Sequence, residues 1–288
     1  MDGTYELFRH YFAVPKHRTP SGNEVGALRG VVTSVLGMFE AGVTHLGVAT
    51  DHIIESFRNE LWPGYKSSAG IEEDLLSQFW PLEDALRSLG VVVWAMTDLE
   101  ADDALGSAAH IASADQRVEQ ILICTPDKDV TQCVVDKFIV QFDRRKREVR
   151  DEAGVVKRFG VNPTSIPDYL ALTGDSSDGF PGLPGWGPKS AAAVLHRFRH
   201  IEAIPDDRRE WKIELRGADR LSRTLAENRE LALLFKDLAT LRIDAPLFDS
   251  VDELRWTGPT PGFATLCDDL DAPELSVRAA GLASASRG

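Results

Sequence analysis

Cysteine is scarce in this chain of 288 residues, which has only Cys124, Cys133 and Cys267. Their odd number and the lack of any CxxC spacing argue against a disulfide framework and against a cysteine zinc site. Long apolar runs are also missing, and without a stretch of about 18 apolar residues no membrane-spanning helix is expected. The first residues lack a basic segment followed by an apolar run, so we expect no secretory signal and a cytoplasmic, reducing location.

An excess of positive charge is missing as well. The chain has 45 acidic and 32 basic residues, which gives a net charge of -13. Nucleic-acid-binding proteins usually carry a basic footprint, so the composition alone argues against that class. The acidity is uneven, however, because residues 1–140 hold 21 acidic and 10 basic side chains, or -11. A solvated acidic surface and a metal-binding acidic pocket both remain open as explanations.

Strand-like and helix-like segments alternate in the first 160 residues. Apolar periodicity predicts helices at 25–40, 81–89 and 101–113, and β-rich runs predict strands at 44–51, 91–96, 119–125 and 137–142. This alternation is typical of parallel βαβ units in an α/β fold. After residue 160 the β-rich runs stop, glycine and proline cluster at 174–188, and helices are expected at 190–198 and 221–237. We therefore expect an α/β domain over residues 1–160 and a helical subdomain over residues 161–288, with a frayed tail at 281–288.

Carboxylates follow three of the expected strands: Asp51, Glu100, Asp102, Asp103, Asp127 and Asp129. Any one of them could simply cap a helix, where aspartate is favoured. Because the carboxyl ends of parallel strands share one edge of a sheet, the three groups are expected to converge. So many negative charges repel one another unless hard cations neutralise them, and carboxylate oxygens suit Mg²⁺ or Mn²⁺. The pattern favours a site for divalent cations.

A glycine-rich segment at 173–195 carries the second informative pattern. Asp175 and Asp178 precede glycines that let the backbone turn tightly and approach another surface. A helix is then expected to begin at Pro188. Exposed amides at a helix N-terminus form a phosphate site, and Lys189 adds a positive charge there.

These motifs together resemble one family. The relevant stretches are DGTYELFRHYFA near the start, FRNELWPGYK at 57–66, LEADD at 99–103, PDKDVTQ at 126–132 and GDSSDGFPGLPGWGPKSA at 174–191. In this order they resemble the 5′-nuclease family, which includes bacterial flap endonucleases and the 5′→3′ exonuclease domain of bacterial DNA polymerase I. No polymerase module follows, so the resemblance is to a stand-alone nuclease. It implies a PIN-like, mostly parallel central sheet with helices on both faces, an arch near 52–80, and then a helix–hairpin–helix (H3TH) subdomain.

The resemblance also implies a set of site residues. The metal ligands would be Asp2, Asp51, Glu100, Asp102, Asp103, Asp127, Asp129, Asp175 and Asp178, the earlier group associated with one divalent cation and the later group with a second. Lys66 and Arg58 match catalytic cations near the arch that meet the scissile phosphate or the 5′ strand. Backbone groups of the glycine hairpin would grip duplex phosphates: Gly182, Leu183, Gly185, Trp186, Gly187, Lys189 and Ser190. A potassium ion bound by Leu183, Gly185 and Ser190 is also expected.

The function implied is that of a structure-specific 5′→3′ exonuclease and flap endonuclease, which uses two metal ions in DNA replication and repair. Its partners would be DNA with 5′ flaps, nicks or free 5′ ends, and also RNA primer strands. We expect a monomer with no membrane association.

Three positions depart from the family pattern. Ala69 stands where the family has arginine, so the arch lacks one cation. Gly179 stands where the family usually has asparagine, which is expected to loosen that turn. Only Met1 precedes Asp2, whereas the family places a short apolar strand there, so the first strand is expected to be truncated or to begin upstream.

Three other functions fit the sequence less well than a nuclease. A DNA-junction-binding homologue without catalysis would be missing metal ligands, yet all nine carboxylates are present. A haloacid-dehalogenase-type phosphatase needs an aspartate two residues before the DGT aspartate, and no residue stands there. A PIN-domain ribonuclease would share the acidic sheet edge but would lack the glycine hairpin.

Overall fold

The computed structural model describes residues 1–285, which divide into two compact units. Unit 1 contains Met1–Ile54, Ser68–Asp115 and the C-terminal part from Asp244, and unit 2 contains Glu55–Ser67 and Gln116–Ile243. Both units are discontinuous in sequence, and the expected arch region at 52–80 is shared between them. The linear division at residue 160 stays a prediction about domain organisation.

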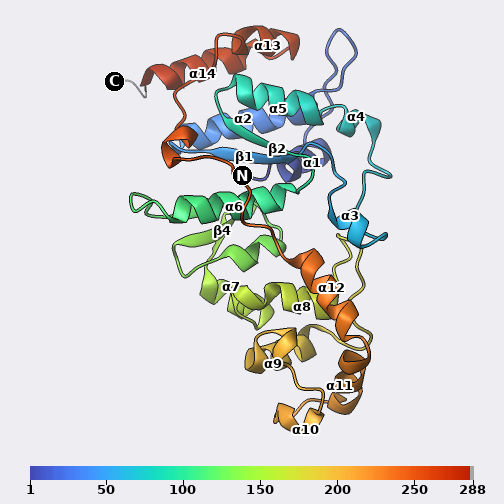
Figure 1. The fold of residues 1–288 in the computed structure, drawn as a ribbon. Coiled ribbons are helices and arrows are strands. Elements are labelled where there is room, and N and C mark those ends of the chain that lie inside the picture. The colour runs from blue at the N-terminus through green and yellow to red at the C-terminus, as the bar shows by residue number, and fades with distance from the viewer. Residues whose placement is uncertain (286–288) are drawn as a thin grey trace. The chain divides into compact units, whose positions relative to one another are not determined.

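Unit 1 is an α/β layer structure. Its elements are α1 (Gly3–Ala13), α2 (Gly26–Glu40), β1 (Gly47–Asp51), α4 (Glu73–Leu76), α5 (Phe79–Ser88), β2 (Val92–Met96), α6 (Ala101–Ser113), the 3₁₀ turn η4 (Val251–Leu254), α13 (Phe263–Asp269) and α14 (Pro273–Ala285). Strands β1 and β2 pair in parallel, from Gly47 opposite Val92 to Asp51 opposite Met96. Figure 1 shows this pair between α2 and α5 on one side and α6 on the other.

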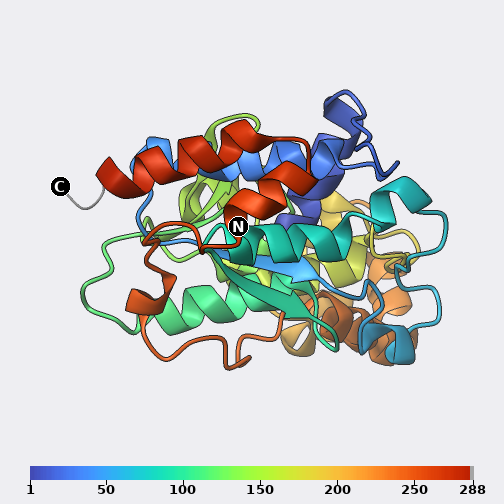
Figure 2. The same ribbon diagram turned by 90° about the horizontal axis from the view of Figure 1, so that it is seen from above.

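Helix α2 is the central helix of unit 1. Its side chains Leu28, Val31, Val32, Val35 and Leu36 are fully buried. A helix that is apolar on most of its circumference must be covered on several sides. Helix α1 packs along it, and α14 covers it on the outside, as Figure 2 shows from above. Since α14 continues to Ala285, most of the tail expected to fray at 281–288 is helical, and residues 286–288 lie outside the described part.

Unit 2 combines a small sheet with a helical bundle. Its elements are α3 (Arg58–Leu61), β3 (Ile121–Ile123), η1 (Asp129–Cys133), β4 (Ile139–Asp143), β5 (Glu148–Arg150), α7 (Glu152–Phe159), η2 (Pro163–Ser165), α8 (Ile166–Thr173), α9 (Pro188–Phe198), η3 (Ile201–Ala203), α10 (Arg208–Trp211), α11 (Ala218–Glu227) and α12 (Arg229–Ala239). Strand β4 pairs in parallel with β3 and antiparallel with β5. Helix α8 packs against α12 and α9 around an apolar core that includes Phe180, Trp211 and Phe235.

The fold class expected from the sequence is confirmed: parallel strands alternate with helices, and between β5 and Ala285 the regular elements are all helices. One predicted helix is different. The pattern at 221–237 predicted a single helix, but the chain forms α11 and α12 with a break at Asn228, whose side-chain amide donates to the carbonyl of Thr224. Among the described helices, none has the length and apolar character needed to span a membrane.

Candidate metal centre

The first acidic group lies in unit 1 at the ends of β1 and β2. Asp2 is the N-cap of α1, where its Oδ1 accepts from the amide of Tyr5 at 2.7 Å. The two residues before α1 also extend the sheet, because Asp2 forms a parallel bridge with Ala49 and the Met1 carbonyl accepts from the Ala49 amide at 3.0 Å. Asp2 therefore lies beside β1.

Asp51 and the LEADD motif meet at the same edge. Oδ1 of Asp51 accepts from the amide of Ala101 at 2.8 Å, which joins the end of β1 to the start of α6. Glu100 and Asp103 form a reciprocal capping box, in which Asp103 Oδ2 accepts from the amide of Glu100 at 2.9 Å. Both carboxylates are buried, and Asp102 lies half-buried in the first turn. The positive end of the α6 dipole favours negative charge here.

The second acidic group lies in unit 2. Asp127 and Asp129 follow β3, and Asp127 Oδ1 accepts from the amide of Asp129 at 2.9 Å. Residues 175–180 form a short loop closed by paired backbone hydrogen bonds between Asp175 and Phe180; we call it the Asp175 loop. One carboxylate oxygen from each of Asp129, Asp175 and Asp178 lies within 4.8 Å of the other two.

The charges in this second group are poorly compensated. Burial, together with the nearby charges of Asp127, Asp178 and Asp175, raises the pKa of Asp129 well above its ordinary value. Lys128 opposes this effect: its Nζ forms an ion pair with Asp175 Oδ2 and lies 3.9 Å from Asp129 Oδ1. Lys128 thus compensates part of the charge of Asp129 and Asp175. The sequence did not predict that Lys128 would be a counter-ion, because the DKD motif at 127–129 does not determine the direction of the lysine side chain.

The residues fit a hard divalent cation. All the donors are carboxylate oxygens, the ligand type that Mg²⁺ and Mn²⁺ prefer. Oδ1 of Asp129 is buried and accepts no hydrogen bond within the described residues, which leaves it available to a cation.

The two cations expected near the arch have different environments. Lys66 lies beside the second acidic group, with its Nζ 3.7 Å from Asp178 Oδ1. Arg58 is only 1% exposed, and its guanidinium donates to the carbonyls of Leu238 at 2.8 Å and Thr240 at 3.1 Å. These carbonyls end α12, where a positive charge is favourable. At this exposure the Arg58 side chain is enclosed by the protein, and its expected contact with a DNA strand stays a prediction.

The glycine hairpin divides into buried and exposed parts. Gly182, Leu183 and Trp186 are buried, and the amides of Leu183 and Trp186 donate to the carbonyls of Leu172 and Leu183. These three residues anchor the hairpin in the core, and the expected contact between backbone groups of the hairpin and DNA stays a prediction. Gly185 and Lys189 are exposed.

The start of α9 is closed by a local cap. The hydroxyl of Ser190 accepts from the Gly187 amide and donates to the Gly187 carbonyl, both at 3.0 Å. Gly185 has a φ of +81°, which explains the glycine there. The exposed turn before Pro188 is therefore rigidly shaped.

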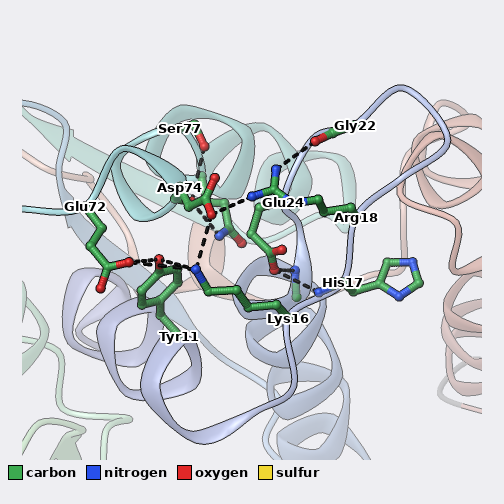
Figure 3. Close-up of polar contacts among 11 residues, drawn as sticks. Tyr11, Lys16, His17, Arg18, Gly22, Glu24, Glu72, Asp74 and Ser77 are labelled. Carbon is green, nitrogen blue, oxygen red and sulfur yellow. Dashed lines mark hydrogen bonds and ion pairs between the residues drawn. The ribbon is translucent and has the colours of Figure 1, made fainter.

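The arch residues that follow Ser68 belong to unit 1 and are held at the surface (Figure 3). Lys16 donates to the Tyr11 hydroxyl at 3.1 Å and to Asp74 at 3.2 Å, and Arg18 donates to Asp74 at 2.7 Å. Hydrogen bonds from Lys16 and Arg18 lower the pKa of Asp74, while those to Tyr11 and Asp74 raise the pKa of Lys16. Tyr11 also donates to Glu72 at 2.7 Å. These contacts fasten α4 to the N-terminal segment.

Comparison with known sequences decides the family. The sequence model described as 5′-3′ exonuclease, N-terminal resolvase-like domain, matches residues 1–160, and the one described as 5′-3′ exonuclease, C-terminal SAM fold, matches residues 161–261. The chain belongs to the 5′-3′ exonuclease family. It is 30% identical over 251 residues to the 5′-3′ exonuclease of Buchnera aphidicola subsp. Acyrthosiphon pisum, covering 86% of this chain and 87% of that protein.

Longer relatives share only this part. The chain is 33% identical over 264 residues to DNA polymerase I of Pseudomonas aeruginosa, which covers 88% of this chain but 28% of the polymerase.

Solved structures with the same fold include the T5 D15 protein co-crystallised with metal ions, at a TM-score of 0.66 and 17% identity over 98% of each chain. The catalytic core of Rad2 in complex with DNA substrate has a TM-score of 0.60 and 17% identity over 98% of this chain and 91% of that one.

Proposed function

We propose that this family member is a metal-dependent 5′→3′ exonuclease and flap endonuclease that hydrolyses DNA phosphodiesters at 5′ ends, flaps and junctions. The observation that carries the proposal is the acidic cluster of unit 2, in which one carboxylate oxygen from each of Asp129, Asp175 and Asp178 lies within 4.8 Å of the others. Such a buried cluster is costly unless cations compensate its charge.

Each acidic group is proposed to hold one divalent cation, Mg²⁺ or Mn²⁺. In unit 1 the ligands would be Asp2, Asp51, Glu100, Asp102 and Asp103, and in unit 2 Asp127, Asp129, Asp175 and Asp178. Bound divalent cations lower the pKa of an attacking water and stabilise the charge on the phosphate and on the leaving 3′ oxygen. Products with 5′-phosphate and 3′-hydroxyl ends are expected.

Two cationic side chains of unit 2 contribute from the protein itself. Lys66 is proposed to contact a phosphate oxygen at the metal site, which its position 3.7 Å from Asp178 supports. Lys128 neutralises part of the cluster, and a divalent cation held by Asp129, Asp175 and Asp178 would compensate the charge that remains.

Duplex DNA is proposed to bind at the exposed part of the glycine hairpin. Gly185 permits close approach of a phosphate, and Lys189 at the start of α9 adds charge where helix amides already favour anions. A potassium ion held by Leu183, Gly185 and Ser190 would fit such a turn. These contacts explain how a chain with a net charge of -13 could bind DNA.

A cleavage assay tests the function directly. A duplex with a labelled 5′ flap should be cut in Mg²⁺ or Mn²⁺, left intact in EDTA, and left intact by Asp178→Asn while that variant still binds it. Asp168→Asn removes the charge of a buried aspartate in the same unit, paired with Lys236 at 2.9 Å, and serves as the control. Binding of flap DNA without cleavage by the wild-type protein in any divalent cation would instead favour a non-catalytic junction-binding homologue.

Three finer statements belong to the same proposal. Its substrates are DNA with 5′ flaps, nicks or free 5′ ends, including those that begin with an RNA primer. The protein acts as a monomer without membrane association. A cytoplasmic location fits its three free cysteines, because disulfides persist only in oxidising compartments.

A further inference from the structure

The segment Glu55–Ser67 lies directly against the Asp175 loop within unit 2. The amide of Lys66 donates to the carbonyl of Asp178 at 3.1 Å, and the indole N–H of Trp62 donates to the carbonyl of Gly179 at 3.0 Å. Two consecutive carbonyls of the loop are thus bound by one short segment. The same contact brings the Lys66 ammonium within 3.7 Å of the Asp178 carboxylate.

Two glycines allow this contact. Gly179 has a φ of +81°, and a Cβ placed on it would lie 1.9 Å from the carbonyl oxygen of Gly64. A Cβ on Gly64 would lie 2.8 Å from the indole nitrogen of Trp62. Asparagine, the usual residue of the family at position 179, tolerates positive φ, but its Cβ has no room here. The glycine that was expected to loosen the turn instead lets the segment approach more closely.

One aromatic ring supports both partners of the contact. Phe235 of α12 meets Trp62 edge-on, with ring centroids 5.1 Å apart, and stacks on Phe180 of the Asp175 loop at 5.5 Å. On the segment itself, the side-chain amide of Asn59 donates to the carbonyl of Lys66 at 2.9 Å. The segment and the loop are therefore held against the same part of the core.

We propose that Gly179 is a positioning residue. Its close contact with Gly64 holds Lys66 against Asp178 and so fixes the position of the lysine side chain relative to this carboxylate. The expected consequence is that Lys66 is fixed beside a carboxylate that holds a cation. This consequence rests on the proposed nuclease function. The contact itself is a property of the fold and can be tested without any cleavage.

Hydrogen exchange at the Lys66 amide tests the contact, because this amide is protected by the Asp178 carbonyl. Gly179→Asn should push the segment away and speed exchange at Lys66 on the order of tenfold or more. Gly217→Asn is the matched control: Gly217 also has a positive φ, +75°, but a Cβ there meets nothing within 4 Å. It should leave exchange at Lys66 unchanged. Equal protection of Lys66 in wild type and Gly179→Asn would overturn the proposal.

A kinetic cycle then tests the consequence. If Gly179 acts through Lys66, Gly179→Asn should lower kcat on a 5′-flap substrate with little change in KM, and adding Lys66→Ala should lower it little further. If Lys66→Ala lowers kcat by the same factor in the wild-type protein and in Gly179→Asn, Gly179 does not act through this lysine and the proposal is refuted. Should Gly179→Asn fail to fold, Trp62→Phe replaces it, since it keeps an aromatic ring beside Phe235 but removes the indole N–H. Unchanged exchange in Trp62→Phe would again refute the contact, whether or not the protein cleaves DNA.

Discussion

The replacement of Asp129 by asparagine should stabilise the protein when no divalent cation is present. Asp129 shares a cluster of atoms within 4.8 Å with Asp175 and Asp178, and the pKa of Asp129 is raised by burial and by these neighbouring charges. Asparagine has nearly the same shape and no charge. The substitution therefore removes repulsion that the folded state carries and the unfolded chain does not.

The magnitude follows from the distances. The carboxylate oxygens lie within 4.8 Å of one another, and two unit charges at that distance repel by about 3.5 kcal/mol at an effective dielectric constant of about 20. Asp129 takes part in two such pairs, which gives repulsion of about 7 kcal/mol, while its attraction to the Lys128 ammonium at 3.9 Å, about 4 kcal/mol on the same scale, is lost in the variant. The expected net gain is on the order of 3 kcal/mol; the charge of Asp127 adds to it, and partial protonation of Asp129 reduces it.

The pH dependence has a definite sign. A carboxyl group whose pKa is raised by folding holds its proton more tightly in the folded state, so stability falls as pH rises from the unfolded pKa through the folded one. Wild type and Asp129→Asn should thus differ little in stability near pH 3, where Asp129 is protonated in both states. The advantage of asparagine should grow as pH rises and level off above the folded pKa.

Thermal unfolding in EDTA and in Mn²⁺ measures the stability of wild type and Asp129→Asn without and with a divalent cation. In EDTA at neutral pH, Asp129→Asn should have the higher Tm. A cation at 100 times its Kd stabilises wild type by about 2.7 kcal/mol, and the variant, which lacks one ligand, should gain less. In Mn²⁺ the difference between the two Tm values should therefore become smaller or change sign.

Asp168→Asn provides the contrast. Asp168 is fully buried, but it accepts from the amide of Ile201 at 2.8 Å and is paired with His200 and Lys236, each at 2.9 Å. The same substitution there removes a compensated charge and should lower the Tm in EDTA and Mn²⁺ alike. If Asp129→Asn also lowers the Tm in EDTA, by a similar amount, the carboxylates of the cluster are not in electrostatic conflict and the reasoning is wrong.

Three further predictions concern other positions. Arg58→Met should destabilise the protein by about 2–4 kcal/mol, because two carbonyls at the end of α12 lose their donor; lower flap cleavage at an unchanged Tm would instead support a contact with DNA. Ala69→Arg restores the cation of the family pattern and should tighten 5′-flap binding several-fold, on the order of 1 kcal/mol, without changing blunt-duplex binding; equal changes on both substrates would remove the arch from the mechanism. Burial and the charge of Asp268 raise the pKa of Cys267 to about 11, so iodoacetamide at pH 8 should alkylate Cys133 well before Cys267. Mass spectrometry measures both alkylation rates, and comparable rates would contradict the burial of Cys267.

Local patterns predicted most of the elements well. The alanine-rich pattern at 101–113 matches α6 at both ends, because its capping carboxylates and its apolar face are both readable in the sequence. The break at Asn228 was missed because α11 and α12 continue the same apolar pattern against one core. A side-chain hydrogen bond to the preceding turn competes with helix continuation there, and that bond leaves little trace in the pattern.

The candidate site divides in a similar way. Carboxylates at strand ends could be predicted, since parallel topology brings those ends to one edge, as Asp51 and the start of α6 show. The surroundings of Arg58, Lys128 and Gly179 could not be predicted. Each depends on a partner far away in the sequence or on the direction of a side chain, and a one-dimensional motif contains neither. Arg58 shows this most clearly, because the carbonyls to which it donates lie 180 and 182 residues away.

The acidic composition of the chain also becomes understandable from these positions. A protein that grips DNA mainly through side-chain charges needs a basic surface, whereas one that uses backbone amides, a helix N-terminus and bound cations does not. Divalent cations in the two acidic groups would convert the most negative parts of the chain into sites that attract phosphate. Affinity for DNA should therefore depend on divalent cations as well as on monovalent salt. In that case the net charge of -13 reflects a protein without its metal ions.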